Sequence, residues 1–267
     1  MKGFILSVPP GPEGMIRLYD KDYHYLVRVR RLRAGSLFDA VLPGGAETRV
    51  RILSTVDNIL IGECLGLVER IPSPIPPIAL FQGLPKGSKM DLILRQAAEG
   101  GVSLVVPFEA EYSTARLREI PEKHKRWQRI IREARQQSGS TVDTTVKPPC
   151  TLDALLEHWE FIKNEYPKPV GILLHQEPID NSDTGSPLVK GSFHGYLGNN
   201  PDFVALAVGP EGGFSPREVS LFMAAGFVPL VMGNTILRTE TAALYGTAAI
   251  RIILLEIETW TSKGSHS

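Results

Sequence analysis

The stretch Phe203-Val204-Ala205-Leu206-Ala207-Val208 runs directly into Gly209-Pro210-Glu211-Gly212-Gly213-Phe214. Its first half is apolar throughout, which is typical of a strand covered on both faces of a sheet. A helix is predicted straight after its second half, because Ser215 suits the N-cap, Pro216 the first helical position and Glu218 a capping box. A strand, a glycine-rich loop and a helix in this order indicate an α/β fold.

The glycine-rich loop is expected to hold a ligand, because such loops bring backbone N–H groups to the carboxyl end of a strand. It matches neither GxGxxG nor GxxxxGK[ST], the signatures of dinucleotide and P-loop sites. Glu211 stands where an anion would approach, and its carboxylate suits a ligand with hydroxyls or positive charge. A tight turn that merely precedes a helix would contain the same residues, because Gly and Pro are ordinary turn residues.

A second unit of this kind lies closer to the C-terminus. A strand is expected at Val228–Met232 and is followed by the segment Gly233–Thr241, in which a long helix is expected to begin near Glu240 and to run through about Glu256. The start of this helix is rich in small residues that permit close packing, namely Ala242, Ala243, Gly246, Ala248 and Ala249. At its first turn, Arg238–Glu240 would serve either catalysis or a simple cap with an exposed ion pair.

The chain from Ile78 onward alternates apolar runs with helical patterns, which favours a mostly parallel α/β sheet. Other strands are expected at Ile78–Gln82, Val102–Pro107 and Val170–His175, and other helices are expected to begin near Met90, His124 and Leu152. The segment Glu177–Gly198, rich in Gly, Ser, Asp and Asn, is expected to be a loop, and the tail Thr261–Ser267 to fray.

Residues 1–70 are expected to form a separate small β-barrel. The short apolar segments Phe38–Leu42, Thr48–Ile52 and Ile59–Ile61 are separated by the turn signals Gly44-Gly45 and Asp57-Asn58. Four prolines then fall within residues 71–77, which favours a stiff, extended linker. The sequence therefore predicts a barrel over 1–70, a linker over 71–77 and an α/β domain over 78–267.

Two basic clusters are candidate phosphate-binding surfaces. In the helix around Trp127, one face contains Trp127, Ile130, Ile131 and Ala134, the opposite face contains Lys125, Arg129, Arg132 and Gln136, and Arg126 and Arg135 flank them. The second cluster is Arg28, Arg30, Arg31 and Arg33, which a strand would place on alternating faces. A solvated helix face and a solubilising edge strand would give the same two patterns.

Composition adds few constraints. The chain has 29 basic and 29 acidic residues, so its net charge gives no argument for nucleic acid. Cys64 and Cys150 lie in unrelated contexts without a CxxC or HExxH motif, so we expect reduced thiols and no metal site. Without a signal-peptide core or a membrane-length apolar run, a cytoplasmic protein that does not enter the membrane is expected.

The segments Gly209–Phe214 and Ile236–Ala242 together resemble the SPOUT class of methyltransferases, and most closely its RsmE family, which methylates N3 of a uridine in small-subunit ribosomal RNA. Further resemblance, which extends over nearly the whole chain, lies in Lys86–Met90 with Glu99, in Gln137–Gly139 and in His24–Leu32.

The resemblance implies a PUA-like first domain that helps hold RNA, and a SPOUT domain with a deep C-terminal trefoil knot, a feature that is rare among proteins. It also implies a homodimer that uses S-adenosyl-L-methionine and acts on 16S rRNA in the small ribosomal subunit. The cofactor would lie in three loops, Leu173–Glu177, Val208–Gly213 and Met232–Thr241.

Site residues are predicted on this basis. Catalysis is assigned to Arg238, Glu240 and Thr239. Cofactor binding is assigned to Leu173, His175, Gln176, Val208, Gly209, Glu211, Gly212, Gly213, Met232, Gly233, Ile236, Leu237 and Thr241. RNA binding is assigned to Arg28, Arg30, Arg31, Arg33, Lys86, Lys89, Arg129 and Arg132.

The chain also departs from the family pattern. Gly100 replaces a usual leucine, Gln136 a usual glutamate and Ser140 a usual arginine, and Thr235 stands where a basic residue is common. The changes at Ser140 and Thr235 remove phosphate contacts, so they bear on how RNA docks more than on the type of reaction.

The expected chemistry is direct displacement of the sulfonium methyl by uridine N3, which must first lose a weakly acidic proton. Arg238 is expected to stabilise the developing negative charge. Glu240 would accept the proton, unless it instead fixes Arg238. Two other functions remain open: a nucleotide-dependent phosphotransferase that uses Gly212-Gly213, and a ribosome assembly factor that binds RNA, acting on another RNA or without activity.

Overall fold

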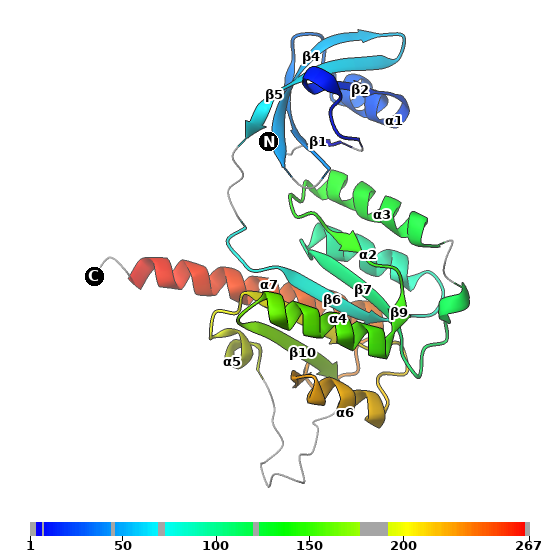
Figure 1. Ribbon diagram of the computed structural model, residues 1–267, viewed down its shortest axis with the longest axis vertical. Helices are drawn as coiled ribbons and strands as arrows, with labels where there is room; N and C mark the ends of the chain where they lie inside the picture. Colours follow the sequence, from blue (N-terminus) through cyan, green and yellow to red (C-terminus); the bar gives the residue numbers. More distant parts are fainter. Residues whose placement is uncertain are drawn as a thin grey trace. The chain divides into compact units, whose positions relative to one another are not determined.

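The computed structural model describes residues 4–6, 8–43, 46–68, 73–119, 123–176 and 192–264 (Figure 1). The chain divides into two compact units. The first contains Met1–Pro72 and Arg135–Asp143, and the second contains Ser73–Ala134 and Thr144–Ser267. Residues 135–143 thus belong to the first unit, although the sequence predicts them within the second domain. One contact that ties them to it is the hydrogen bond from the Ile5 N–H to Gln136 Oε1, 2.8 Å long.

The first unit is built on a five-stranded sheet with the order β1-β3-β4-β5-β2, in which β1 and β3 are parallel and the other neighbours antiparallel. Its elements are β1 (Phe4–Ile5), the 3-10 turn Pro12–Gly14, β2 (Met15–Leu18), α1 (Asp20–Tyr23), the π-helix His24–Val29, β3 (Leu37–Val41), β4 (Glu47–Val56) and β5 (Ile59–Val68). The three strand segments expected here are confirmed. Asp57 and Asn58 both have positive φ, as a tight hairpin turn requires, whereas Gly44-Gly45 lies outside the described residues.

The sequence predicts a strand through Arg28–Arg33, and this prediction is wrong. The segment is a helix that continues α1 as far as Val29, followed by a loop in which Arg31 has a φ of 56°. Tyr23 and Leu26, three positions apart, are both buried in the core of this unit. That helical spacing holds the segment in place, while the alternation of Val and Arg after it imitates a strand.

The second unit contains a seven-stranded sheet in which every pairing between described strands is parallel. Its order is β12-β10-β11-β6-β7-β8, with β9 also paired to β7. The strands are β6 (Ile78–Gly83), β7 (Leu104–Glu109), β8 (Thr145–Val146), β9 (Cys150–Thr151), β10 (Pro169–His175), β11 (Phe203–Val208) and β12 (Phe227–Val231). The helices are α2 (Lys89–Glu99), the 3-10 turn Leu117–Glu119, α3 (Lys123–Ser138), α4 (Leu152–Glu165), α5 (Phe193–Leu197), α6 (Pro216–Ala224) and α7 (Thr239–Gly264).

Helices cover both faces of this sheet, because its strands are apolar on both sides. On one face, side chains such as Leu80 and Leu206 pack with α2, α3, α5 and α7. On the other face, Phe81 and Ala205 pack with α4 and α6. Trp127, Ile130, Ile131 and Ala134 of α3 are buried, as the helical spacing predicts.

Two boundaries differ from expectation. The region Glu177–Gly198 was expected to be a loop, but Phe193–Leu197 is helical, because the Ser192 side chain caps the Gly195 N–H at 3.0 Å. Residues 177–191 lie outside the described part. Helix α7 extends to Gly264 rather than ending near Glu256, so the tail is helical over 261–264, and residues 265–267 are not described.

Helix α7 packs very closely on the sheet. A Cβ atom added to Gly246 would lie 2.6 Å from Leu206 Cδ2 and 3.0 Å from Leu174 Cδ1. The absence of a side chain at this position therefore lets the helix backbone approach β10 and β11. Within the described residues, no helix is both long and apolar enough to cross a membrane.

Candidate active site

A cavity of about 220 Å³ lies at the carboxyl ends of β12, β10 and β11, three neighbouring strands. The loops that leave these strands form its walls, and the start of α7 closes it. Its lining consists of Lys89, Leu174, His175, Gln176, Val208, Gly209, Pro210, Glu211, Gly213, Val231, Met232, Gly233, Thr235, Ile236, Leu237, Arg238, Thr239 and Ala242. In parallel α/β sheets, the carboxyl edge is the usual place for a ligand.

The loop 209–215 after β11 is held by many contacts. The Gly213 N–H donates to the Pro210 carbonyl at 3.0 Å. Ser215 and Glu218 form the expected capping box at the start of α6. A Cβ on Gly209 would lie 2.9 Å from the backbone carbon of Gly213, so a side chain at position 209 would not fit within this turn.

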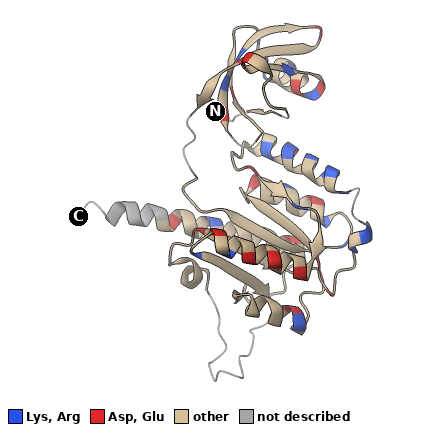
Figure 2. Ribbon diagram, viewed as in Figure 1, with Lys and Arg blue, Asp and Glu red and all other residues tan. Residues whose placement is uncertain are grey.

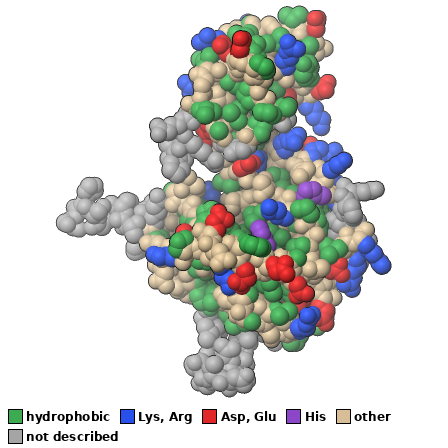
Figure 3. Space-filling model, in the orientation of Figure 1, with side chains coloured by type: hydrophobic (Ala, Val, Ile, Leu, Met, Phe, Trp, Pro, Cys, Tyr) green, Lys and Arg blue, Asp and Glu red, His purple; other side chains and the backbone are tan. Residues whose placement is uncertain are grey.

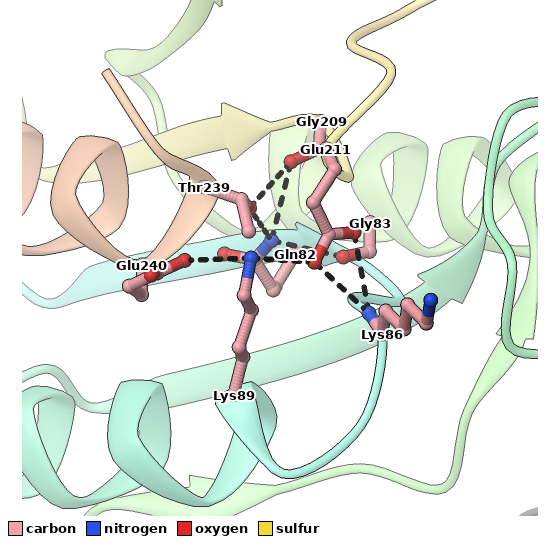
Figure 4. Close-up of polar contacts among 8 residues, drawn as sticks. All are labelled: Gln82, Gly83, Lys86, Lys89, Gly209, Glu211, Thr239 and Glu240. Carbon is pink, nitrogen blue, oxygen red and sulfur yellow. Dashed lines mark hydrogen bonds and ion pairs between the residues drawn. The ribbon is translucent and has the colours of Figure 1, made fainter.

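Charged side chains from three segments meet beside this loop (Figure 4). Lys89 Nζ lies 2.8 Å from Glu211 Oε1 and 3.4 Å from Glu240 Oε2. The Lys86 N–H also donates to both oxygens of Glu211, at 3.1 and 3.2 Å. Glu240 Oε2 is buried and receives no aligned hydrogen bond from a described residue, so its contact with Lys89 is electrostatic. Figure 4 shows the Lys86 side chain directed away from this group.

These pairs fix the charges of Lys89 and Glu211. Burial works to raise the pKa of Glu211, but hydrogen bonds from Lys89 and from backbone N–H groups outweigh it, so its pKa lies below 4.5. The hydrogen bond to Glu211 outweighs the desolvation of the Lys89 ammonium, so the pKa of Lys89 lies above 10.5. Glu211 was expected to repel anions, but its charge is already paired with Lys89.

A second polar group lies beneath the cavity and is buried. Gln82, at the end of β6, is fully buried, and its Nε2 donates to Thr239 Oγ1 and to the Gly83 carbonyl, both at 2.9 Å. The Thr239 hydroxyl in turn donates to the Gly209 carbonyl at 2.6 Å. Because its proton is committed to a backbone carbonyl, Thr239 positions other groups and is not itself a proton donor to substrate.

The structure brings most of the predicted cofactor residues together. Those that line the cavity are His175, Gln176, Val208, Gly209, Glu211, Gly213, Met232, Gly233, Ile236 and Leu237. Of the predicted catalytic residues, Arg238 and Thr239 line it, whereas Glu240 contacts it through Lys89. Among the described residues Arg238 forms no ion pair, so Glu240 does not fix Arg238 in this structure.

Three predicted cofactor residues do not line the cavity. Leu173 is buried against α4 and α6, because alternate strand residues point to opposite faces and Leu174 takes the cavity side. Gly212 faces Tyr112, since a Cβ there would lie 2.8 Å from Tyr112 Cβ. Thr241 lies on a different side of α7 from Thr239 and Ala242, which are three positions apart.

Sequence reasoning assigned Lys89 to RNA and did not identify Gln82. Both residues act through partners more than 120 positions away in the chain, and spacing within one sequence does not reveal such contacts. The only sequence signal for Gln82 is a polar residue that ends an otherwise apolar run, Ile78–Phe81.

The predicted RNA-binding arginines of α3 lie on an exposed face. Lys125, Arg129 and Arg132 are exposed, and Figure 2 shows basic residues along this helix. Arg126 pairs with Asp91, and Arg135 is buried and pairs with Asp143, so Arg135 is not a free surface charge. On the opposite face of the sheet, α4 exposes Asp153, Glu157, Glu160 and Glu165, and Figure 3 shows acidic side chains gathered there.

Comparison with known proteins agrees with this geometry. Residues 72–251 match the family model of an RNA methyltransferase domain. The chain is 32% identical over 247 residues to ribosomal RNA small subunit methyltransferase E of Synechocystis, which covers 91% of this chain and 74% of the relative. The chain belongs to the ribosomal RNA small subunit methyltransferase E family.

Other relatives and structures agree with this family assignment. Methyltransferase E of Bacillus subtilis is 27% identical, over 86% of this chain and 87% of the relative. The crystal structure of a probable rRNA-methyltransferase from Porphyromonas gingivalis has a TM-score of 0.75 and 25% identity, covering 96% of this chain and 99% of that one. Methyltransferase E of Neisseria gonorrhoeae, bound to S-adenosyl methionine, shares the fold with a TM-score of 0.72 and 24% identity, covering 95% and 98% of the two chains.

Proposed function

We propose that this protein transfers the methyl group of S-adenosyl-L-methionine to N3 of a uridine in the 16S rRNA of the small ribosomal subunit. The observation that carries the proposal is the cavity at the carboxyl ends of β10, β11 and β12, formed by the loops that also carry the family motifs. The choice of uridine N3 rests on the family resemblance.

The cavity residues fit this cofactor. Gly213 leaves backbone without a side chain at the cavity wall, where an added Cβ would meet only the Gln176 amide, 3.5 Å away, so that a ligand can come close to the main chain. Leu174, Val208 and Leu237 provide apolar surface for a nucleoside. When bound, the cofactor supplies a methyl group on a positively charged sulfur, a good leaving group for direct displacement.

The chain's own residues would then activate the uracil ring. Arg238 is exposed at the cavity and forms no ion pair with another described residue, so its guanidinium is available to stabilise the anion formed at N3. Glu240 is the candidate base, with Oε2 buried beside Lys89. Thr239 lies between Arg238 and Glu240 in the chain, and its bond to the Gly209 carbonyl anchors this segment to the glycine turn. Alignment of the two reactants would supply much of the acceleration.

RNA is proposed to contact two surfaces, one on each unit. On the second unit, exposed Arg129 and Arg132 of α3 offer positive charge to phosphates. The acidic residues of α4 disfavour RNA binding at the opposite face of the sheet. On the first unit, Arg28, Arg31 and Arg33 are exposed and Arg30 is half-buried. We also propose a PUA-like barrel for the first unit and a trefoil knot for the C-terminal segments, which the close packing of Gly246 supports. A cytoplasmic location stays a prediction.

The protein is further proposed to be a homodimer that pairs through α7. This helix exposes Tyr245 and Ile252, each more than half accessible, and Ile236 is 74% exposed at the adjacent loop. They border or lie near an apolar groove of about 520 Å³ between α5, β12 and α7. Light scattering should give a dimer mass for the native protein and a monomer for Tyr245→Glu. Phe161→Glu, at an exposed position of α4, should stay dimeric.

The activity is tested by incubating the protein with undermethylated small ribosomal subunits and isotopically labelled S-adenosyl-L-methionine, then mapping the product by mass spectrometry. We expect one methyl group at N3 of one uridine. A methyl group at carbon 5 or on ribose would overturn the N3 assignment. RNA binding without methyl transfer would instead support an assembly factor.

A nucleotide-dependent phosphotransferase is disfavoured by the same geometry. The chain lacks a P-loop, and the Lys89 ammonium already contacts two carboxylates, so it is not available to a phosphate. Calorimetry should therefore detect binding of S-adenosyl-L-methionine and none of ATP.

A further inference from the structure

We infer that Gln82 is a positioning residue for methyl transfer. Through Thr239 and Gly209, its side chain connects the start of α7 with the loop after β11. The inference rests on the proposed function. Gln82 does not line the cavity, and its side chain is completely buried at the end of β6. It therefore acts through the groups it holds (Figure 4).

The orientation of the Gln82 amide follows from its partners. Its nitrogen faces the Gly83 carbonyl at 2.9 Å and the Gly209 carbonyl at 3.5 Å. Carbonyl oxygens only accept hydrogen bonds, so the NH₂ end must point toward them. The Thr239 hydroxyl then accepts a hydrogen bond from Gln82 and donates one to the Gly209 carbonyl. The directions of all four hydrogen bonds are thus mutually consistent.

The other end of the amide indicates a role beyond packing. Gln82 Oε1 is buried and has no hydrogen-bond donor among the described residues. A buried acceptor without a partner lowers stability, and an apolar side chain of similar size would avoid that loss. The presence of an amide here is explained by its NH₂ group, which reaches the start of α7 and the β11 loop together.

Two of the partners of Gln82, Thr239 and Gly209, adjoin residues of the proposed reaction. Thr239 follows Arg238 directly, so the position of the hydroxyl fixes the backbone that carries the guanidinium. Gly209 begins the glycine turn on the cofactor side. When Gln82 is removed, Gly209 loses only the 3.5 Å contact with the Gln82 amide and keeps its 2.6 Å bond from Thr239, whereas Thr239 loses the 2.9 Å bond that ties it to β6. The larger effect is therefore expected on turnover and the smaller on cofactor affinity.

The test compares Gln82→Met, Thr239→Val, Thr239→Ser and the double variant Gln82→Met/Thr239→Val. For each we would measure kcat on small subunits, the Kd of S-adenosyl-L-methionine by calorimetry, and Tm. Gln82→Met should lower kcat about tenfold, as expected for the loss of one positioning contact, and should change Kd less than about threefold. Thr239→Val should lower kcat and raise Kd. Thr239→Ser keeps the hydroxyl, so its kcat and Kd should stay close to those of the native protein.

The decisive result is the double variant, which should be no worse than Thr239→Val alone, because both changes break one connection. Gln96→Met is the matched control, since Gln96 in α2 also has a buried Oε1 without a hydrogen-bond donor in the described part of the chain and does not line the cavity. It should leave kcat and Kd unchanged. Multiplicative losses in the double variant, an unchanged kcat for Gln82→Met, or an equal loss for Gln96→Met would overturn the inference. An inactive native protein that still binds the cofactor would instead count against the proposed reaction.

Discussion

The cavity loops that follow β11 and β12 are held in opposite ways. The loop after β11 is buried at Gly209 and Pro210 and is bonded at Gly213, Glu211 and Ser215. The loop after β12 is exposed from Gly233 to Ile236, and no hydrogen bond joins Gly233–Leu237 to another described residue.

This difference separates two tasks of the site. A loop that is held by several hydrogen bonds can present its backbone to a small ligand with little loss of conformational entropy on binding. A loop anchored only at its ends can adapt to a larger partner, and here it ends in Arg238, the proposed catalytic cation. Changes in the first loop should therefore act mainly on cofactor affinity, whereas changes at Thr235 and Arg238 in the second should act mainly on turnover or RNA binding.

The largest expected effect is that of Arg238→Ala. Removal of the guanidinium should lower kcat by about 100- to 1,000-fold, in the range for loss of a group that stabilises transition-state charge. Because the second loop does not fix the first, the Kd of S-adenosyl-L-methionine should change less than about threefold. Methyl-transfer rates and calorimetry measure the two quantities, with Arg217→Ala on α6 as the control. Unchanged turnover would remove Arg238 from the mechanism.

A glycine substitution in each loop tests the contrast in rigidity. Gly209→Ala would place its Cβ 2.9 Å from the Gly213 backbone, so we expect the turn to shift, Kd to rise about tenfold and the free energy of unfolding to fall by about 1–3 kcal/mol. Gly233→Ala has open space around its Cβ and only a φ of 76° to accommodate, which costs about 1 kcal/mol. Equal effects of the two variants on Kd would break the comparison.

Lys89→Met tests the ion pairs that hold the first loop. Partly exposed pairs contribute little, so the loss in the free energy of unfolding at pH 7 should be about 0.5–1 kcal/mol. Glu211 has a lowered pKa in the folded state, so its contribution is complete above pH 4.5 and disappears as pH falls through that lower value. The variant should lose less stability over this acid range than the native protein.

Lys86→Met is the matched control for this acid-range experiment, because Glu211 accepts from the backbone of Lys86 rather than from its side chain. Chemical denaturation at pH 7 and at several acid pH values would measure the effect. An acid dependence for Lys89→Met equal to that of the native protein would show that this pair does not set the Glu211 pKa.

The smallest expected effect concerns Thr235, which lies in the exposed loop and for which the family resemblance predicts a basic residue. Thr235→Lys adds one phosphate contact, so KM for the ribosomal subunit should fall a few-fold at low salt, and the gain should shrink as salt rises. Cofactor Kd should not change. A gain that is independent of salt would argue against a phosphate contact.

The sequence predicts the local parts of this site well and the long-range parts poorly. Ser215, Pro216 and Glu218 predict the start of α6 correctly, because a capping box involves neighbours in the chain. The pairing of Lys89 with Glu211, and of Gln82 with Thr239, depends on the order of strands in the sheet. The error at Arg28 has a related cause, since the burial of Leu26 in a core of distant strands decided between helix and strand.

The absence of a side chain at Gly246 has a practical consequence for which cofactors the cavity can accept. Because the glycine lets α7 rest against Leu174 and Leu206, it determines how far Ala242, one turn earlier, reaches into the cavity. Alanine at position 246 would press on the Leu206 and Leu174 side chains, so that either these side chains or the helix must shift and the cavity wall at Leu174 changes shape. Position 246 is therefore the place to begin if the enzyme is to be redesigned for synthetic cofactors that deliver alkyl groups larger than methyl.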